Sequence, residues 1–143
     1  MSNEHYLKLQ RMYAKAPINA FYQPQMVVEE AKAEIVVAIT SQMHHSAGGV
    51  HGSVYFKLLD DAAFFAANSI ETDVFVLTSD FHIRLLRPVS EGGLRANGWV
   101  THAGRRNILA RSELRDDKGK LIASGQGCFV RSSMKLSPDC DYE

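Results

Sequence analysis

The segment 54–70 constrains the fold more than any other part of this sequence. Written as a helix, it has apolar side chains nearly all the way round. A helix on a protein surface keeps a broad polar face, so a helix of this kind must be covered by surrounding structure. The pattern therefore predicts a buried central helix. Its polar members are Lys57, Asp60, Asp61, Asn68 and Ser69.

The segments around this helix have the pattern of strands. From Met26 to Thr40 the apolar residues alternate, which predicts one half-buried strand. One strand, one helix and four further strands form an α+β order, so we expect an antiparallel sheet wrapped around the helix. A single sheet covers one side of a helix, and we expect a second copy of the chain to cover the rest. The four later strands are predicted at 74–87, 93–103, 107–116 and 120–131.

The two ends of the chain are predicted to flank a domain at 26–132. Residues 3–16 have a helical spacing of apolar positions that ends at Pro17, so 1–25 are interpreted as a helix and a lead-in. Residues 133–143 form a polar tail that we expect to fray. A chain of 143 residues with 45% hydrophobic residues suits one domain with a substantial core.

The charge balance and the cysteine content disfavour several classes of protein. Sixteen Lys and Arg residues balance 16 Asp and Glu residues, so the chain lacks the net positive charge that is typical of nucleic-acid-binding proteins. No apolar run approaches the ~20 residues that cross a bilayer, and the N-terminus has no apolar signal core. The two cysteines, Cys128 and Cys140, disfavour a disulfide framework. We expect a cytoplasmic protein with no membrane partner.

Asp60 is the helix residue that solvation explains least. Helical spacing places Lys57, Asp61 and Asn68 within about 40° of one another, as a solvent-facing stripe. Asp60 lies about 100° from Asp61, among apolar residues. A carboxylate in that position costs free energy unless it is paired. Two interpretations stay open: Asp60 is a functional carboxylate, or it is the frayed edge of the solvated stripe.

Gly52 marks the junction between a loop rich in glycine and histidine, residues 44–53, and the predicted helix. The first amides of a helix have no internal partners, and a glycine lets a ligand approach them closely. They can therefore hold an oxyanion in acyl transfer, although many such glycines only make a turn. Eight helical residues separate Gly52 from Asp60 by ~12 Å. If both act on one carbonyl, they come from two chains.

Residues 50–66, VHGSVYFKLLDDAAFFA, resemble the signature of hotdog-fold acyl-CoA thioesterases of the phenylacetate-degradation type. The segment LTSDFHIRLLRPV at 77–89 and the later strands also resemble this family, over roughly residues 30–130. The resemblance implies the hotdog fold, hydrolysis of an acyl-CoA substrate, and a homodimer or homotetramer. It implies no cofactor, because coenzyme A is part of the substrate. The matching residues are His51, Gly52, Leu58, Asp60, Ala62 and Ala66.

The resemblance also implies roles for individual residues. Asp60 corresponds to a carboxylate that acts as nucleophile or general base. Gly52 corresponds to the backbone donor that polarises the thioester carbonyl, and His51 to the histidine that helps to fix the loop. Thr78 stands where some members place a hydroxyl that assists the attacking water.

Two positions depart from the family pattern. Ser53 replaces the second glycine of the His-Gly-Gly triplet, and His45 stands where the family usually has Asn or Gln. A histidine can donate a hydrogen bond to a carbonyl, so His45 stays a catalytic candidate and Ser53 a binding candidate.

Four arginines are candidates for binding coenzyme A, because guanidinium groups suit phosphate oxygens. The candidates for the phosphates of coenzyme A are Arg84, Arg87, Arg105 and Arg106.

Three other interpretations compete with thioester hydrolysis: a metal site, a dehydratase or hydratase, and a non-catalytic binding protein. His44, His45 and His51 crowd one loop, but no Cys or carboxylate stands at ligand spacing, so no metal site is predicted. A dehydratase or hydratase of the same fold would use a catalytic His with Glu or Asp in motifs that this sequence lacks. A non-catalytic acyl-CoA-binding protein stays open because of His45 and Ser53.

Overall fold

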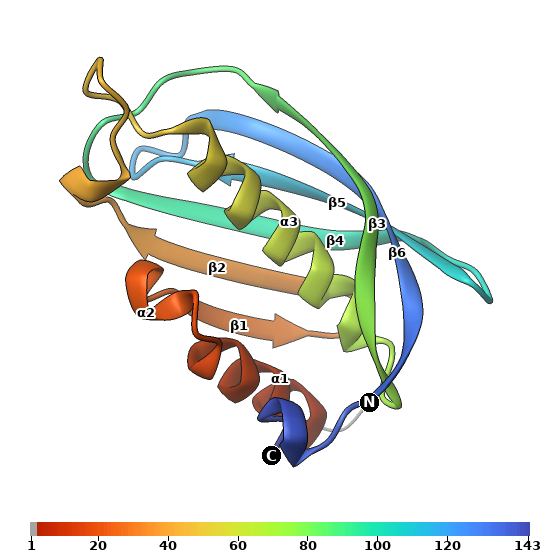
Figure 1. Cartoon of the computed structure of the whole chain (residues 1–143). Helices are drawn as coiled ribbons and strands as arrows, with labels where there is room; N and C mark the ends of the chain where they lie inside the picture. The colour runs from red at the N-terminus through yellow and green to blue at the C-terminus, as the bar shows by residue number, and fades with distance from the viewer. Residues whose placement is uncertain (1–2) are drawn as a thin grey trace.

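One six-stranded antiparallel sheet curves around the central helix α3 (Gly52–Ser69) in the computed structural model, which describes residues 3–143 (Figure 1). The strand order β1-β2-β4-β5-β6-β3 places β1 and β3 at the two edges. The α+β class and the buried central helix are confirmed. The strands are β1 (Gln25–Glu29), β2 (Lys32–Ala38), β3 (Val74–Leu85), β4 (Gly93–Ala103), β5 (Asn107–Arg115) and β6 (Leu121–Lys135). The short elements are α1 (Asn3–Lys15), α2 (Asn19–Tyr22) and two 3-10 helices, Ser41–Met43 and Pro138–Cys140.

The contact between α3 and β4 is unusually close. Leu58, Leu59 and Ala62 of the helix have no exposed surface. A Cβ atom at Gly98 of β4 would collide with the backbone of Ala62 and Ala63. Only a residue without a side chain lets the sheet approach the helix to this distance. Gly98 therefore sets how deeply α3 sits in the curved sheet.

The single strand predicted over 26–40 is wrong, because the chain turns back within it. β1 and β2 pair as a hairpin in which Glu29 lies opposite Lys32, and Ala31 in the turn has a left-handed φ of 61°. An alanine is not a residue that marks such a turn. The signal that was missed is a change of parity. Buried positions are even in β1 (Met26, Val28) and odd in β2 (Ala33, Ile35, Val37).

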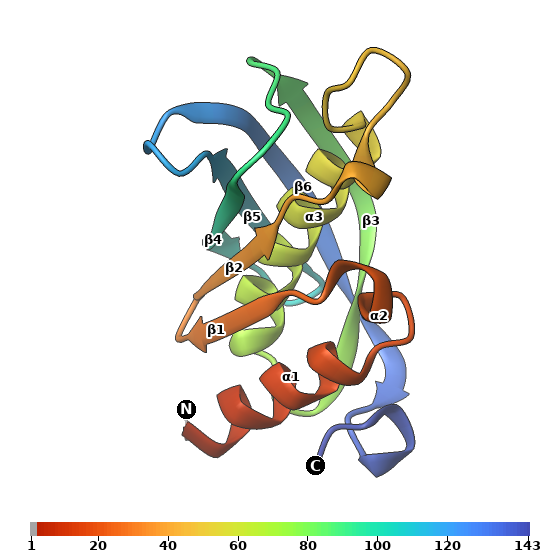
Figure 2. The same ribbon diagram turned by 90° about the vertical axis from the view of Figure 1, so that its left-hand side faces the viewer.

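The N-terminal helices pack against the same core as α3. Leu9, Met12 and Tyr13 of α1 are buried with the residues of the central helix. Figure 2 shows α1 alongside the edge strand β1, and the side chain of Gln10 accepts a hydrogen bond of 3.0 Å from the Val28 amide. The edge of β1 is thus covered by α1. Among residues 3–143, no helix is both long and apolar enough to span a membrane.

The edge of β3 differs from that of β1. This strand pairs with β6 on one side, and within residues 3–143 no strand pairs with its other side. Leu77 and Leu85 on it are 48% and 53% exposed. A long edge strand with exposed apolar side chains invites pairing with another chain. The two edges of the sheet are therefore not equivalent.

The polar tail expected at 133–143 packs against the fold instead of fraying. β6 continues to Lys135, four residues beyond the predicted end at 131. The hydroxyl of Tyr142 lies 2.7 Å from Nδ1 of His5 on α1. The first turn of α1 and the C-terminal segment therefore meet beside the C-terminal end of α3.

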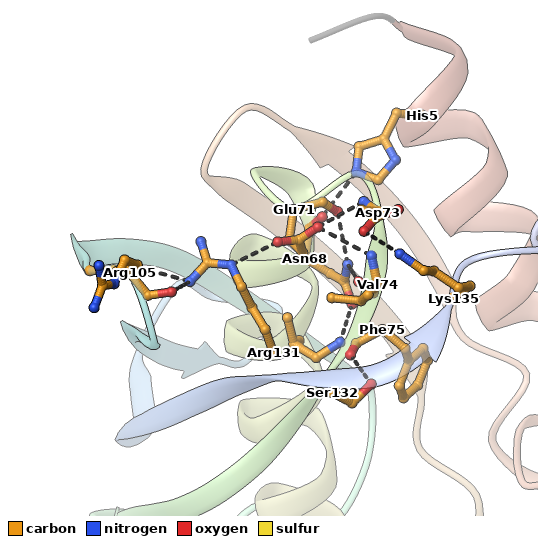
Figure 3. Close-up of polar contacts among 12 residues, drawn as sticks. His5, Asn68, Glu71, Asp73, Val74, Phe75, Arg105, Arg131, Ser132 and Lys135 are labelled. Atoms are coloured by element: carbon orange, nitrogen blue, oxygen red, sulfur yellow. Dashed lines mark hydrogen bonds and ion pairs between the residues drawn. The ribbon is translucent and has the colours of Figure 1, made fainter.

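Asn68 near the end of α3 is fully buried, so the prediction that it faces solvent is wrong. Its Oδ1 accepts from the Val76 amide at 2.9 Å, and its Nδ2 donates to the carbonyls of Glu71 and Val74. His5 Nε2 donates to the Asn68 carbonyl at 2.9 Å (Figure 3). These bonds join α3 to the start of β3 and to α1, which fixes β3 against the helix.

Candidate active site

Asp60 lies in the middle of α3 and faces the edge strand β3. The hydroxyl of Thr78 donates a hydrogen bond of 2.9 Å to Asp60 Oδ1. The pairing of β3 with β6 shifts register between Thr78 and Asp80, and such a bulge re-aims nearby side chains. The structure thus brings together the carboxylate and the hydroxyl that the sequence singled out.

A cavity of about 300 Å³ opens beside this pair. Its walls come from the α1–α2 segment, from α3 and from β3. Asp60 and Thr78 both line it, together with mostly apolar side chains. The half-buried Asp60 carboxylate therefore faces a largely apolar cavity, the kind of space in which proteins bind small ligands. The apolar lining includes Met12, Ile18, Phe64, Phe65, Phe75 and Leu77.

Burial raises the pKa of Asp60 from its ordinary value of 3.8 to about 6. The hydrogen bond from Thr78 lowers it, Asp61 raises it, and Lys57 lowers it. A carboxylate with this pKa is ionised at neutral pH and is more basic than an exposed one. That combination suits a general base or a nucleophile.

The solvent-facing stripe predicted for Lys57 and Asp61 is wrong, because the N-terminal helices cover it. The hydroxyl of Tyr13 and the ammonium of Lys57 each donate a hydrogen bond of 2.6 Å to Asp61 Oδ2. Helical spacing gave the angles of these residues correctly, but it gave no information about what lies above them. Sequence reasoning missed Tyr13 as part of the site for the same reason.

Gly52 begins α3, and His51 is its N-cap. His51 Nδ1 accepts a hydrogen bond of 3.0 Å from the Ser53 amide, so the proton of the neutral ring is on Nε2. The Ser53 hydroxyl lies 2.8 Å from the same nitrogen. A Cβ at Gly52 would lie 3.3 Å from Leu85 Cδ1. The His51 side chain therefore caps the N-terminus of α3. The Leu85 side chain of β3 lies close to Gly52 and leaves little room for a side chain there.

One chain does not bring Gly52 and Asp60 together, since the helix between them spans ~12 Å. His45 stays with the loop at the N-terminal end of α3. Its ring is exposed, and Nδ1 accepts a bond of 3.1 Å from the Ala47 amide. Within one chain, His51 contacts Ser53 at the start of α3, His45 lies on the preceding loop, and none of the three is among the residues that line the cavity with Asp60.

The four candidate arginines lie at opposite ends of the sheet (Figure 1). Arg84 is near the end of β3, beside a cavity of about 590 Å³ on the outer face of the sheet, and Arg87 follows β3. Arg105 and Arg106 occupy the exposed turn between β4 and β5. The structure does not bring these two groups together.

Arg131 holds the turn between β4 and β5, a role the sequence did not suggest. Its Nη1 donates to the carbonyls of Gly104 and Arg105 at 2.9 Å each, and its Nε donates to Glu71 Oε1 at 2.7 Å (Figure 3). Burial raises the pKa of Glu71, but hydrogen bonds from the Asp73 amide and Arg131 outweigh this and lower it overall. The carboxylate is thus ionised and anchors Arg131.

Comparisons with known proteins give one family and one fold. The family profile of the thioesterase superfamily matches residues 47–123. A 1,4-dihydroxy-2-naphthoyl-CoA hydrolase of Listeria monocytogenes is 29% identical over 96 residues, which cover 66% of this chain and 78% of that protein.

Two solved structures have the same architecture. The PaaI protein from the phenylacetic acid degradation operon of Escherichia coli has a TM-score of 0.86 at 24% identity, over 95% of this chain and 99% of that chain. A conserved protein of Pseudomonas aeruginosa has a TM-score of 0.79 at 26% identity, over 85% of this chain and 98% of that chain. The similarity therefore extends over nearly the whole fold.

Proposed function

Because the chain belongs to the thioesterase superfamily and has the hotdog fold, we propose that it hydrolyses an acyl-CoA thioester to the free acid and coenzyme A. The observation that carries this proposal is the Asp60 carboxylate, which accepts a hydrogen bond from Thr78 and lines an apolar cavity. The relative in Listeria monocytogenes is named as a hydrolase of a CoA thioester, which supports the same substrate class.

In the proposed reaction, Asp60 acts in one of two ways. It takes a proton from the water that attacks the thioester carbonyl, or it attacks the carbonyl itself and forms an anhydride that water then opens. In both routes the C–S bond breaks, and the coenzyme A thiolate leaves and takes up a proton. Thr78 occupies Oδ1 of the carboxylate, so Oδ2 is the oxygen we assign to the water or the carbonyl.

We place the oxyanion donor on a second chain. Gly52 and Asp60 of one chain are ~12 Å apart, whereas one carbonyl must contact both groups. Antiparallel pairing of two β3 edges would continue the sheet and place two α3 helices side by side in opposite directions. The Gly52 amide of one chain would then approach Asp60 of the other. The exposed Leu77 and Leu85 on β3 support a dimer of this kind.

We assign the remaining candidate residues either to binding coenzyme A or to holding the loop that carries the oxyanion donor. We assign His51 to holding the start of α3, because its side chain caps the helix. Ser53 contacts His51, and His45 lies on the loop before α3, where we expect the pantetheine arm to pass. For the phosphates we keep both arginine groups, Arg84 with Arg87 and Arg105 with Arg106, because coenzyme A is long enough to run along a dimer interface.

A thiol-release assay with a panel of acyl-CoA thioesters tests this proposal. The natural protein should release coenzyme A from at least one of them. Asp60→Asn should lose about 100-fold or more in kcat, since it keeps the shape of the side chain without its basicity. The matched control is Asp139→Asn, which removes an exposed carboxylate away from β3 and from the residues that line the cavity, and it should keep full activity.

Two outcomes contradict the proposal. Tight binding of an acyl-CoA without any release of thiol would identify a non-catalytic binding protein. Equal turnover by the natural protein and by Asp60→Asn would remove Asp60 from the mechanism. Circular dichroism and light scattering on each variant separate these outcomes from a failure to fold or assemble.

A further inference from the structure

Three side chains join the N-terminal helices to the central helix directly beside Asp60. Tyr13 on α1 and Lys57 on α3 both donate to the carboxylate of Asp61, at 2.6 Å each. The ammonium of Lys57 also lies over the rings of Tyr13 and of Tyr22 on α2, 5.3 and 4.9 Å from their centroids. We call Tyr13, Lys57 and Asp61 the latch cluster.

The latch cluster is enclosed, unlike an ordinary surface ion pair. Tyr13 is 5% exposed, and the side chains of Lys57 and Asp61 are 12% and 20% exposed. The Tyr13 ring packs edge-on against Phe65 at 4.9 Å, and Asn19 Nδ2 donates to the Tyr13 carbonyl at 2.8 Å. Removing one member of an enclosed pair leaves a poorly solvated partner, so these groups depend on one another.

The latch cluster is also part of the wall of the Asp60 cavity. Tyr13, Lys57 and Asp61 all line this cavity, and Ile18 between α1 and α2 lies on it with 59% exposure. The cavity has its wall on this side only while α1 and α2 stay against α3. The three side chains that hold the helices together are therefore the ones that close the space next to the carboxylate.

Charged and titratable groups face Asp60 from few directions. Asp61 and Lys57 lie on its own helix, Tyr13 faces it from α1, and Tyr22 stands behind Lys57 on α2. From β3 it receives the hydroxyl of Thr78. Burial and Asp61 both raise the pKa of Tyr13, so its phenol stays protonated and acts as a donor.

We propose that Tyr13, Lys57 and Asp61 are positioning residues of the thioesterase site: they hold α1 and α2 as the wall of an acyl cavity, and they keep a compensated ion pair beside the Asp60 carboxylate. This inference rests on the proposed function, because it assigns the cavity to the acyl group. It makes the N-terminal helices part of the catalytic machinery, although they precede the sheet and carry no group that touches the reacting atoms.

The pH dependence of hydrolysis tests the electrostatic half of the proposal. Lys57→Met leaves the Asp61 charge uncompensated, so the Asp60 proton is held more tightly and the acid limb of kcat/KM should move to higher pH. Asp61→Asn leaves the Lys57 charge uncompensated, so the limb should move to lower pH. We expect each shift to be about half a pH unit or more. Lys57→Arg keeps the charge and should leave the limb in place.

Opposite shifts from two touching residues have one explanation, since damage to the fold would move both profiles in the same way or lower both without a shift. The double variant Lys57→Met with Asp61→Asn should return the limb close to its natural position. Shifts of the same sign, or none, with the natural enzyme active, would overturn this half of the proposal.

Tyr13→Phe tests the other half, because it removes one donor and keeps the ring. We expect KM for the acyl-CoA to rise about 3- to 10-fold with a smaller change in kcat, since the loosened wall costs binding. Amide hydrogen exchange over residues 13–22 should become faster. The matched control is Tyr6→Phe, on the same helix but not among the residues that line the cavity. If KM and the amide exchange rates are unchanged in Tyr13→Phe, the proposal that Tyr13 holds α1 and α2 as the cavity wall is wrong.

A measurement without turnover separates this inference from the proposed function. The titration of the Asp60 carboxyl can be followed by carbon-13 NMR in the natural protein, in Lys57→Met and in Asp61→Asn. If no acyl-CoA is hydrolysed by the natural protein, the proposed function fails, and this titration together with the exchange rates still decides what the latch cluster does. If hydrolysis occurs and the three proteins have the same Asp60 titration, the proposed function stands and the electrostatic role of the latch cluster is wrong.

Discussion

Thr78 and Asp60 are joined by a hydrogen bond of 2.9 Å between the edge strand β3 and the middle of the central helix. The bond favours the ionised carboxylate, whereas burial disfavours it, and the balance raises the pKa of Asp60 to about 6. The strand that would meet a second chain is therefore the strand that tunes the carboxylate.

Hydrolysis should decline as the pH falls through about 6, the pKa of Asp60. Below that pH the carboxyl is protonated and can neither accept a proton nor attack a carbonyl, so activity is lost on the acid side. The measurement is kcat/KM from pH 4.5 to 8 with one acyl-CoA. Thr78→Val lacks the bond that lowers this pKa, so its acid limb should lie at higher pH. A profile that stays flat down to pH 4.5 would contradict the role of Asp60.

Asp60→Asn should make the protein more stable at pH 7.5. The folded-state pKa of Asp60 is about 6, above its ordinary value of 3.8, so the proton is bound more tightly in the folded state. Its stabilising contribution is complete below pH 3.8 and is lost as the pH rises through 6. At pH 7.5 the ionised carboxylate therefore costs free energy that Asn does not, on the order of 1–2 kcal/mol.

Urea unfolding at equal protein concentration measures this effect at pH 7.5 and 4.5. The gain should be present at pH 7.5 and largely absent at pH 4.5. Asp139→Asn, on an exposed carboxylate outside β3, should show no such difference. A loss of stability at pH 7.5 in Asp60→Asn would mean that favourable contacts of the ionised carboxylate outweigh the cost of its burial, which contradicts the prediction.

Gly98→Ala should destabilise the fold, because a Cβ at this position collides with the backbone of Ala62 in α3. The helix must move away from the sheet, which we expect to cost about 1–3 kcal/mol in the free energy of unfolding. Gly49→Ala is the control. The one tight contact of a Cβ there is with the far end of the exposed His45 side chain, at 3.1 Å, which can move, and the Val89 carbonyl oxygen lies at an ordinary 3.7 Å. Equal stability of both variants in urea would show that α3 does not depend on Gly98 for its depth.

Mixing two inactive variants tests whether the site is shared between chains. Asp60→Asn removes the carboxylate, and Gly52→Leu blocks the helix amides; the exposed Leu85 beside Gly52 can give way. If each site uses Asp60 of one chain and Gly52 of the other, a mixed dimer has one site with both defects and one with neither. Activity should then return to about half of the natural level per mixed dimer. No recovery, with subunit exchange verified by mass spectrometry, would show that each chain builds its own site.

The sequence predicted the parts of the fold that depend on local periodicity. The central helix and the four later strands are found close to their predicted bounds, and the resemblance around Asp60 led to the observed hotdog fold. The hairpin between β1 and β2 was missed because its turn uses Ala31 in a left-handed conformation, without the glycine or asparagine that would have marked it. In that region the parity of the buried positions carried more information than the turn residues.

The errors at the site have a different origin. Helical spacing correctly separated Asp60 from Lys57 and Asp61, but the direction of solvent was inferred from polarity alone. The covering residues, such as Tyr13, lie more than 40 positions earlier in the chain. Nothing in the local pattern of α3 reveals them, since a partly buried ion pair and a solvated one have the same spacing. The latch cluster therefore became visible only in three dimensions.

The unequal edges of the sheet limit how this protein can polymerise. The edge of β1 is occupied by α1, with Gln10 on the Val28 amide, while within residues 3–143 β3 has no partner on its outer side. Two copies that joined through β3 would each use the sheet edge that is unpaired within residues 3–143. The continuous sheet would then end at two chains instead of extending into a fibre. A larger assembly of such pairs would then form through the faces of the sheets and not through their edges.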